Sequence, residues 1–122
     1  MAIHNELGKW GEDIACEKLI AEGYAICERN WRMGHYEIDI IASNGREIIF
    51  AEVKTRSDRA TDPLEAVDSR KIRHMAASAN VYLEANGLPQ QARFDLFGIS
   101  GTPDDYELEH VPDAFDVPMS NP

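Results

Sequence analysis

The chain has 122 residues, of which 43% are hydrophobic and 28% charged, and its formal net charge is −10 at pH 7. This length predicts one domain with a real core, and the fractions are ordinary for a globular protein. The opening residues contain no apolar run and no stretch approaches membrane-spanning length, so we expect neither a signal peptide nor a membrane partner. We therefore expect a cytoplasmic protein, with Cys16 and Cys27 reduced in its core.

The negative charge argues against a nucleic-acid-binding protein, because phosphates attract basic surfaces. The charge is unevenly distributed, however: the residues after 100 carry six acids and no Lys or Arg. Several basic residues of the first hundred are grouped: Arg29/Arg32, Lys54/Arg56/Arg59 and Arg70/Lys71/Arg73. This distribution weakens the objection without removing it.

The first predicted element is a helix over residues 6–22, which Gly23 ends. Glu12 lies on the rim of its apolar stripe, where it is either a structural first-turn acid favoured by the helix dipole or part of a site. Gly8 and Gly11 weaken the helix intrinsically, and they would allow another segment to approach closely.

Next we expect a strand over residues 24–31 and then a β-hairpin. Two runs rich in Ile, Val and aromatic residues, 36–42 and 47–56, flank Asn44-Gly45, which is the strongest local hairpin signal. A turn centred on this pair predicts three cross-strand pairs: Ala42 with Glu47, Ile40 with Ile49, and Asp39 with Phe50.

This register groups charged side chains on one face of the hairpin, because paired residues and residues two apart share a face. That face carries Asp39, Phe50, Glu52 and Lys54. The opposite face is apolar and is expected to be the core side, with Ile38, Ile40, Ile49, Ala51 and Val53. Charged groups beside Ile41, Ile48 and Phe50 are costly unless they bind a ligand or one another.

Residues 55–63 are polar and aperiodic, so we expect a loop that leaves the sheet directly after Lys54. Its Arg56 and Arg59 suit phosphate binding, although a loop arginine can simply be solvated. Pro63 suits a first helical turn.

A longer helix is predicted from its N-cap Asp68 to about Asn86, with Gly87 as its stop. Lys71 lies in the first turn, where a cation opposes the helix dipole, so we expect a partner that is either a phosphate or a salt-bridging acid. A strand over residues 93–99 and an edge strand over 106–111 complete the domain. Residues 112–122 form an acidic tail that we expect to be disordered.

Asp39 followed by Glu52-Val53-Lys54 resembles the Asp…Glu-x-Lys signature of the PD-(D/E)XK nuclease superfamily. More specifically, the chain resembles the YraN-like family of small bacterial proteins, described as predicted endonucleases and similar in core to archaeal Holliday-junction resolvases. Further pieces carry this resemblance between about residues 7 and 99: Gly11-Glu12, Gly23-Tyr24, Arg29-Asn30-Trp31-Arg32, Glu37-Ile38-Asp39, Thr55-Arg56, Lys71 and Arg93-Phe94-Asp95. Ile38 replaces the Pro of the superfamily's name, as in resolvase-like relatives.

The resemblance implies an α/β fold with a restriction-endonuclease-like core, a mixed β-sheet flanked by helices, in a single nuclease-like domain over residues 1–111. It also implies Mg²⁺, or Mn²⁺, bound by Asp39, Glu52 and the backbone carbonyl of Val53. The implied catalytic residues are Glu12, Asp39, Glu52 and Lys54. To these we add Arg56, Arg59 and Lys71 as nucleic-acid-binding residues.

The predicted function is a Mg²⁺-dependent endonuclease that hydrolyses DNA phosphodiester bonds, with branched or junction DNA as substrate. By analogy with the resolvases, we expect a homodimer. One alternative is a non-catalytic nuclease-fold module that binds nucleic acid or acts as an adaptor through a protein partner in DNA processing. Another is that Asp39, Glu52 and Lys54 form a purely structural cluster of ion pairs.

Overall fold

The computed structural model describes residues 2–89 and 91–116, and for residues 2–5 it describes the backbone alone. The sheet has five strands in the order β1-β2-β3-β4-β5, and all neighbours are antiparallel except β3 and β4, which are parallel. The elements are α1 (Ala2–Ala21), β1 (Ala25–Met33), β2 (Tyr36–Ser43), β3 (Glu47–Arg56), the 3₁₀ turn η1 (Pro63–Ala66), α2 (Ser69–Asn86), β4 (Gln91–Thr102) and β5 (Asp105–Val111).

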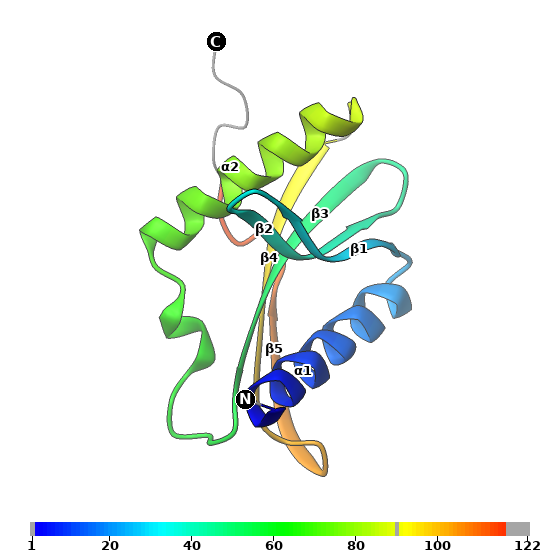
Figure 1. Ribbon diagram of the computed structural model, residues 1–122. Coiled ribbons are helices and arrows are strands. Elements are labelled where there is room, and N and C mark those ends of the chain that lie inside the picture. The colour runs from blue at the N-terminus through cyan, green and yellow to red at the C-terminus, as the bar shows by residue number, and fades with distance from the viewer. Residues whose placement is uncertain (1, 90, 117–122) are drawn as a thin grey trace.

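One helix covers each face of this sheet (Figure 1). Helix α2 connects β3 to β4, which is the kind of crossover that parallel neighbouring strands require. The predicted α/β class, with a mixed sheet flanked by helices, is therefore confirmed. Within the described residues, neither helix is long and apolar enough to cross a membrane.

The helix ends follow the sequence signals. Gly23 has a φ of +98°, and the N–H of Tyr24 donates to the carbonyl of Leu19 at 3.0 Å, which closes α1. The carboxylate of Asp68 accepts a hydrogen bond from the N–H of Lys71 at 2.9 Å, and Gly87 ends α2 with a φ of +59°. The start of α1 differs from the prediction, because the helix begins four residues earlier, at Ala2.

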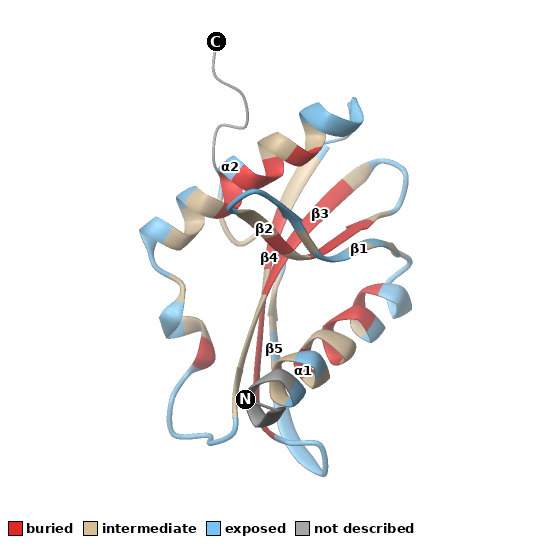
Figure 2. Ribbon diagram, in the orientation of Figure 1, coloured by how far each residue is buried: buried red, intermediate tan, exposed pale blue. Residues whose placement is uncertain are grey.

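Two apolar clusters form the core, one under each helix, and buried residues concentrate in the sheet and on the inner helix faces (Figure 2). The α1 cluster includes Cys16, Leu19, Ile40, Ile49, Ala51, Phe97 and Ile99. The α2 cluster includes Ile38, Ile41, Ile48, Phe50, Met75, Ala79, Tyr82 and Phe94. The prediction that Cys27 is a core residue is wrong, because Cys27 is exposed.

The hairpin between β2 and β3 has a different register from the one predicted. Ser43 pairs with Ile48 and Ile40 with Ala51, so the turn centres one residue later, on Gly45 and Arg46. The Asn44 side chain determines this turn, since its amide oxygen accepts hydrogen bonds from the N–H groups of Arg46 and Glu47, both at 2.9 Å. The resulting shift is two residues, and an even shift leaves each β3 side chain on its predicted face.

One residue of β2 does change sides. Ile38 packs in the α2 cluster, whereas Ile40, which shares a face with it in a regular strand, packs in the α1 cluster. The prediction that Ile38 and Ile40 share a face is therefore wrong. The side-chain alternation of β2 is interrupted around Asp39, the residue between them.

The beginning of the predicted tail lies against the sheet. The N–H of Ala114 donates to the carbonyl of Phe94 at 2.7 Å, and the Phe115 ring stacks on the Phe94 ring at a centroid distance of 5.1 Å. The predicted tail spans residues 112–122, and its residues 117–122 lie outside the described part of the chain.

Candidate active site

The site is centred on Asp39, at the point where β2 and β3 stop pairing. The last backbone pair of this ladder is Ile40 with Ala51. Beyond it, Oδ2 of Asp39 accepts a hydrogen bond from the backbone N–H of Val53 at 2.9 Å. The carboxyl group thus satisfies a β3 donor and is held close to the strand that carries the other predicted site residues.

Asp39 has a strongly perturbed acidity. Burial is the largest cause that raises the pKa of its carboxyl to about 7, and the negative charge of Glu52 is the second. The charge of Glu12 also raises this pKa, whereas the Val53 hydrogen bond and the charge of Lys71 lower it. The charges of Glu52 on β3 and Glu12 on α1 therefore both act on the carboxyl of Asp39.

Glu52 is only 5% exposed, and two lysines contact its carboxylate. Its Oε2 lies 3.4 Å from Nζ of Lys54, two residues later on the same strand. It also lies 3.2 Å from Nζ of Lys71, in the first turn of α2. Of the two partners considered for Lys71, a phosphate or an acid, the structure supplies the acid.

Glu12 approaches from α1, and a glycine makes this approach close. A Cβ added at Gly11 would overlap Cγ2 of Thr55 and lie 3.5 Å from Cγ1 of Val53. Gly11 therefore lets α1 pack directly on the part of β3 that carries the site. A Cβ added at Gly8 would meet no atom within 4 Å.

Asn30 is a site residue to which the sequence analysis gave no role. Its Nδ2 donates to Oε1 of Glu12 at 2.9 Å, and Nη2 of Arg29 lies 3.4 Å from the same oxygen. Asn30 has a φ of +52°, in the left-handed region that non-glycine residues rarely adopt. Strained residues of this kind cluster at functional sites. The only signal in the sequence was the position of Asn30 within the Arg29-Asn30-Trp31-Arg32 motif.

The donor set fits a hard divalent cation held partly by water and phosphate. Mg²⁺ commonly binds through one or two carboxylates and keeps several waters, and Asp39 and Glu52 supply two carboxylates. A cation between them would offset the repulsion that raises the pKa of Asp39. Among the side chains that the structure describes, no three His, Cys, Asp or Glu form a metal-binding group. Asn30 and Arg29 instead hold Glu12.

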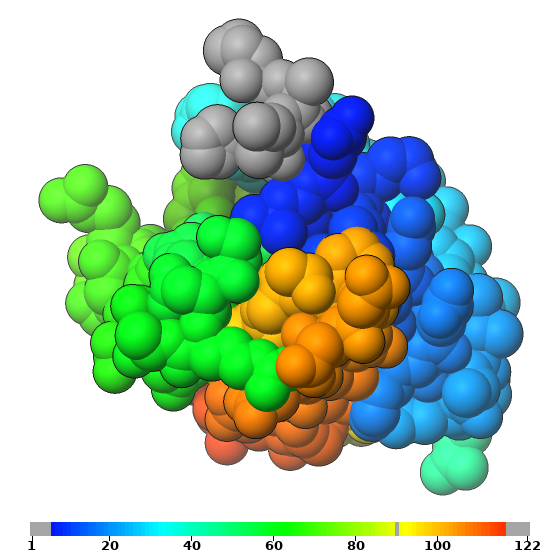
Figure 3. Space-filling view, turned by 90° about the horizontal axis from the view of Figure 1, so that it is seen from below, coloured from blue at the N-terminus to red at the C-terminus, as the bar shows by residue number. Residues whose placement is uncertain are grey.

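The two loop arginines do not contact these acids. Arg59 reaches across to β5, where it lies 2.7 Å from Asp105 and 3.6 Å from Glu107. Figure 3 shows the segment after β3, in green, against the turn between β4 and β5, in orange. Nη1 of Arg56 donates to the carbonyl of Thr55 at 3.1 Å.

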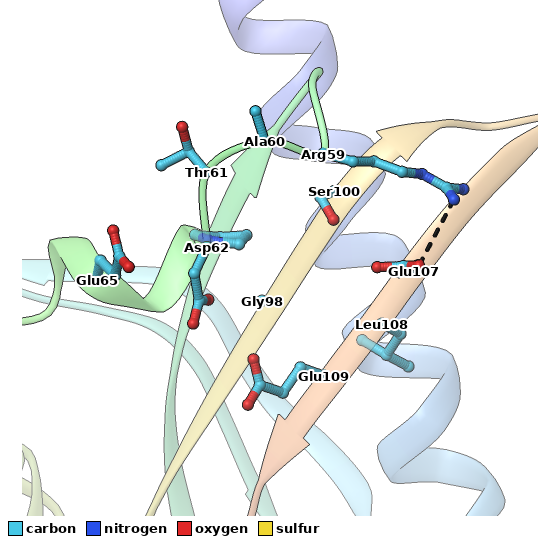
Figure 4. A pocket seen from close by; sticks show the side chains of 11 residues that line it. Arg59, Ala60, Thr61, Asp62, Glu65, Gly98, Ser100, Glu107, Leu108 and Glu109 are labelled. Carbon is cyan, nitrogen blue, oxygen red and sulfur yellow. Dashed lines mark ion pairs between the residues drawn. The ribbon is translucent and has the colours of Figure 1, made fainter.

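Arg59 borders a pocket of about 650 Å³ between this loop and strands β4 and β5 (Figure 4). Besides Arg59, its charged lining residues are Asp62, Glu65, Glu107 and Glu109. Four acids surround one arginine that is already paired. The pocket therefore does not favour a phosphate.

Arg93 and Asp95 of the Arg93-Phe94-Asp95 motif form a separate network with His110 on the α1 side of β4, whereas Phe94 packs in the α2 cluster. Asp95 is fully buried and accepts hydrogen bonds from Arg93 at 2.8 and 2.9 Å, and Nε2 of His110 lies 2.7 Å away. Burial would raise the pKa of Asp95, but the hydrogen bonds from Arg93 and His110 lower it below its usual value. This network joins β4 and β5, and we interpret it as structural.

With this geometry, the chain can be compared with known proteins. A family model, "Uncharacterised protein family UPF0102", matches residues 11–99. The chain belongs to this family. It is the YraN family that the sequence motifs resembled. The matched region begins at Gly11 and includes every site residue described above.

Individual UPF0102 proteins match nearly the whole chain. One from Bacteroides fragilis is 43% identical over 122 residues, covering 98% of this chain and 99% of its own. One from Bacteroides thetaiotaomicron is 41% identical over 120 residues, with the same coverage. Among solved structures, Archaeoglobus fulgidus Hjc, a Holliday junction resolvase from an archaeal hyperthermophile, is 16% identical. Its TM-score is 0.49, and the match covers 87% of this chain and 77% of that chain.

Proposed function

We propose that this UPF0102 protein is a Mg²⁺-dependent endonuclease that hydrolyses phosphodiester bonds in DNA. One observation carries the proposal: at the end of a strand ladder, the half-buried carboxyl group of Asp39 interacts electrostatically with the buried carboxyl group of Glu52, which two lysines contact. A structural ion-pair cluster accounts for Glu52 and its two lysines. It does not account for Asp39, for which the structure gives no ion pair among the described residues and whose pKa is raised to about 7.

Each residue would have a separate role in hydrolysis. Asp39, Glu52 and the carbonyl of Val53 would hold the cation, which when bound supplies an activated water near neutral pH and stabilises charge on the phosphate. Lys54 would orient the attacking water or neutralise the negative charge that develops on the phosphate. Glu12, which Asn30 orients, would accept a hydrogen bond from water at the edge of the site.

The remaining assignments follow from the resemblance and the surface charges. We propose a branched or junction DNA substrate, and a homodimer that presents two sites to it. Lys71 would exchange Glu52 for a substrate phosphate once a cation binds the carboxylates. Arg56 would contact the DNA backbone next to Lys54. Arg59 would first have to leave Asp105, so it is the weakest of the three predicted DNA contacts. We propose that this chemistry takes place in the cytoplasm.

The test is Mn²⁺- or Mg²⁺-dependent nicking of a four-way junction, a flap and a linear duplex of the same sequence. We expect Asp39→Asn and Lys54→Met to lose at least about 100-fold in rate. Matched controls are Glu109→Gln, which neutralises an acid in the pocket of Figure 4, and Lys9→Met, which removes an exposed lysine on α1. If Asp39→Asn cleaves as fast as its control, the proposal is wrong.

A second candidate is a non-catalytic adaptor that acts through a protein partner. The net charge of −10 and the acidic pocket beside β5 favour it. Calorimetry separates the two functions: a nuclease site should bind Mn²⁺, and Glu52→Gln should abolish the binding. An adaptor should bind no divalent cation at this position.

A further inference from the structure

Three aromatic rings from two elements lie together beside the candidate site. The ring centroids of His35 and Tyr36 are 4.3 Å apart, and those of Tyr36 and His74 are 6.1 Å apart. The angles between these ring planes are 31° and 15°, so the rings have similar orientations. His35 and Tyr36 come from the β1–β2 hairpin, whose turn lies against α2 in Figure 1, and His74 comes from α2 itself. We call these three residues the ring cluster.

The ring cluster is accessible to solvent. His35 is exposed, and Tyr36 and His74 are half-buried. None of the three belongs to either apolar core cluster. One contact fixes the hairpin on the helix, since the N–H of Glu37 donates to Oγ of Ser78 at 3.3 Å. Aromatic residues that serve only as core packing would be buried more fully than these.

A basic groove connects the ring cluster to the site. His74 lines a cavity of about 370 Å³ at the start of α2, together with Ala66, Asp68, Arg70 and Lys71. Asp68 is the one acid in this lining, and its carboxylate is engaged by the N–H of Lys71. The Lys71 ammonium group lies 3.2 Å from the carboxylate of Glu52, so one end of the groove meets the site. This combination of cations and an aromatic ring is absent from the acidic pocket beside β5.

The spacing fits a short stretch of polynucleotide. Lys71 and His74 are three residues apart on α2, about 4.5 Å along the helix axis. Tyr36 and Asp39 are three residues apart on β2, about 10 Å along the strand. One strand of DNA advances about 3.4 Å per nucleotide. At this rise of a duplex strand the two distances correspond to about one and about three nucleotides, so the rings lie within about three nucleotides of a phosphate held at the site.

We propose that the ring cluster and the basic groove bind an unpaired DNA strand next to the scissile phosphate. A base can stack on a side-chain ring only when its own face is free, so internal bases of a duplex cannot use this surface. The groove lysine and arginine contact the backbone, and the rings contact the bases without reading sequence. This inference rests on the proposed nuclease function and specifies its substrate: DNA with unpaired nucleotides beside the cleaved bond.

Binding can be tested without cleavage. Fluorescence anisotropy in EDTA compares a labelled oligothymidine of about 12 nucleotides with a blunt duplex of the same length. We expect wild-type protein to prefer the single strand. Tyr36→Ala and His74→Ala should each weaken single-strand binding about fivefold or more, the lower end of the usual stacking contribution. Tyr36→Phe, which keeps a ring, should bind within about twofold of wild type.

Two further variants control for folding and for general aromatic loss. His35→Ala changes an exposed residue and should weaken binding without lowering the unfolding temperature. Tyr106→Ala removes another exposed ring, on β5 against Trp10, and should leave the affinity unchanged. A 2-aminopurine base in the oligonucleotide should be quenched by wild type and by Tyr36→Phe, but less by Tyr36→Ala.

The outcomes separate this inference from the nuclease proposal. The inference of single-strand binding is overturned if wild type prefers the duplex, or if folded His35→Ala and His74→Ala both bind the single strand as wild type does. A protein that nicks DNA but shows either result is a nuclease with a different substrate. Ring-dependent single-strand binding without any metal-dependent nicking would support the binding surface and contradict the nuclease.

Discussion

The carboxylate of Asp39 accepts a hydrogen bond from the backbone N–H of Val53 at 2.9 Å, one residue beyond the last β2–β3 backbone pair. This single contact explains why the two strands can separate without leaving a buried donor unsatisfied. It also fixes Asp39 close to Glu52, whose charge helps to raise the pKa of Asp39 to about 7. The site therefore has stored electrostatic repulsion in the absence of a cation.

The first prediction concerns the pH dependence of stability. The pKa of Asp39 is raised from 3.8 in the unfolded chain to about 7 in the folded chain, so the folded state favours the protonated form. This contribution to stability is full below about pH 4 and is lost as the pH rises through about 7. Asp39→Asn is always neutral and can still accept the Val53 hydrogen bond. Its stability relative to wild type should therefore rise between pH 4 and pH 7.

Urea denaturation of both proteins in EDTA at several pH values measures this difference. Asp105→Asn, which changes an exposed aspartate on β5, should show no such trend. A structural ion-pair role for Asp39 predicts the reverse, namely that Asp39→Asn becomes less stable than wild type as the pH rises.

The second prediction concerns the contact between α1 and β3. Gly11→Ala would place a methyl group against the side chain of Thr55, so it should destabilise the protein by about 1–3 kcal/mol. Gly8→Ala in the same helix meets no atom within 4 Å and should stabilise it by about 0.5–1 kcal/mol. Thr55→Ser removes the obstructing methyl group and should restore much of the loss in the double variant. Thermal unfolding of wild type, Gly8→Ala, Gly11→Ala and the Gly11→Ala/Thr55→Ser double variant tests this. Equal effects of the substitutions at Gly8 and Gly11 would contradict the close packing.

The third prediction separates strain from function at Asn30. Asn30→Gly removes the amide that holds Glu12 but tolerates the φ of +52°. It should keep wild-type stability to within about 1 kcal/mol, because relief of strain offsets the lost hydrogen bond. Nicking activity should nevertheless fall about tenfold, since Glu12 is no longer oriented. Activity at the wild-type level would assign Asn30 a structural role only.

The site was predictable from sequence only in part. The spacing of Asp39, Glu52 and Lys54 placed them near one another, because any error of an even number of residues in the hairpin register preserves the faces of the strand. The register itself was not predictable from Asn44-Gly45, since the Asn44 side chain moved the turn by one residue. The change of side at Ile38 accompanies the Asp39–Val53 hydrogen bond next to it, and no local pattern encodes either.

Long-range contacts explain what else was missed. Lys71 was recognised as a cation that needed a partner, but the pairing with Glu52 joins α2 to β3 across the sheet face. Likewise, the rest of β2, all of β3 and the turn η1 separate His35 and Tyr36 from His74 in the sequence. The ring cluster therefore exists only once α2 packs on the hairpin. The helix ends at Gly23, Asp68 and Gly87, by contrast, depend on these local residues, and those ends were predicted.

The fourth prediction concerns competition between Lys71 and a metal ion for Glu52. Lys71→Met leaves the buried carboxylate with Lys54 as its remaining lysine partner, so the metal-free protein should lose about 1–3 kcal/mol of stability. Mn²⁺ should bind more tightly to this variant, because no ammonium group has to leave Glu52 first. Calorimetry measures the affinity, with Arg70→Met on the exposed side of the same turn as control. Weaker Mn²⁺ binding by Lys71→Met would show that Lys71 instead positions Glu52 for the cation.

The last prediction tests whether the Arg93–Asp95–His110 network is structural. Asp95→Asn removes a buried charge that accepts two hydrogen bonds from Arg93 and one from the N–H of Asp113. Arg93 would keep only its longer ion pair with Glu47, at 3.6 Å, and the loss of its buried partner should cost about 3–5 kcal/mol at neutral pH. The pKa of Asp95 is lowered in the folded protein, so its contribution is present above about pH 4 and is lost as the pH falls through the lowered value. The stability difference between wild type and Asp95→Asn should therefore narrow in strong acid.

Asp105→Asn breaks only an exposed pair with Arg59 and should cost less than about 1 kcal/mol. A small, pH-independent effect of Asp95→Asn would contradict the structural interpretation and leave the buried network open to a functional one.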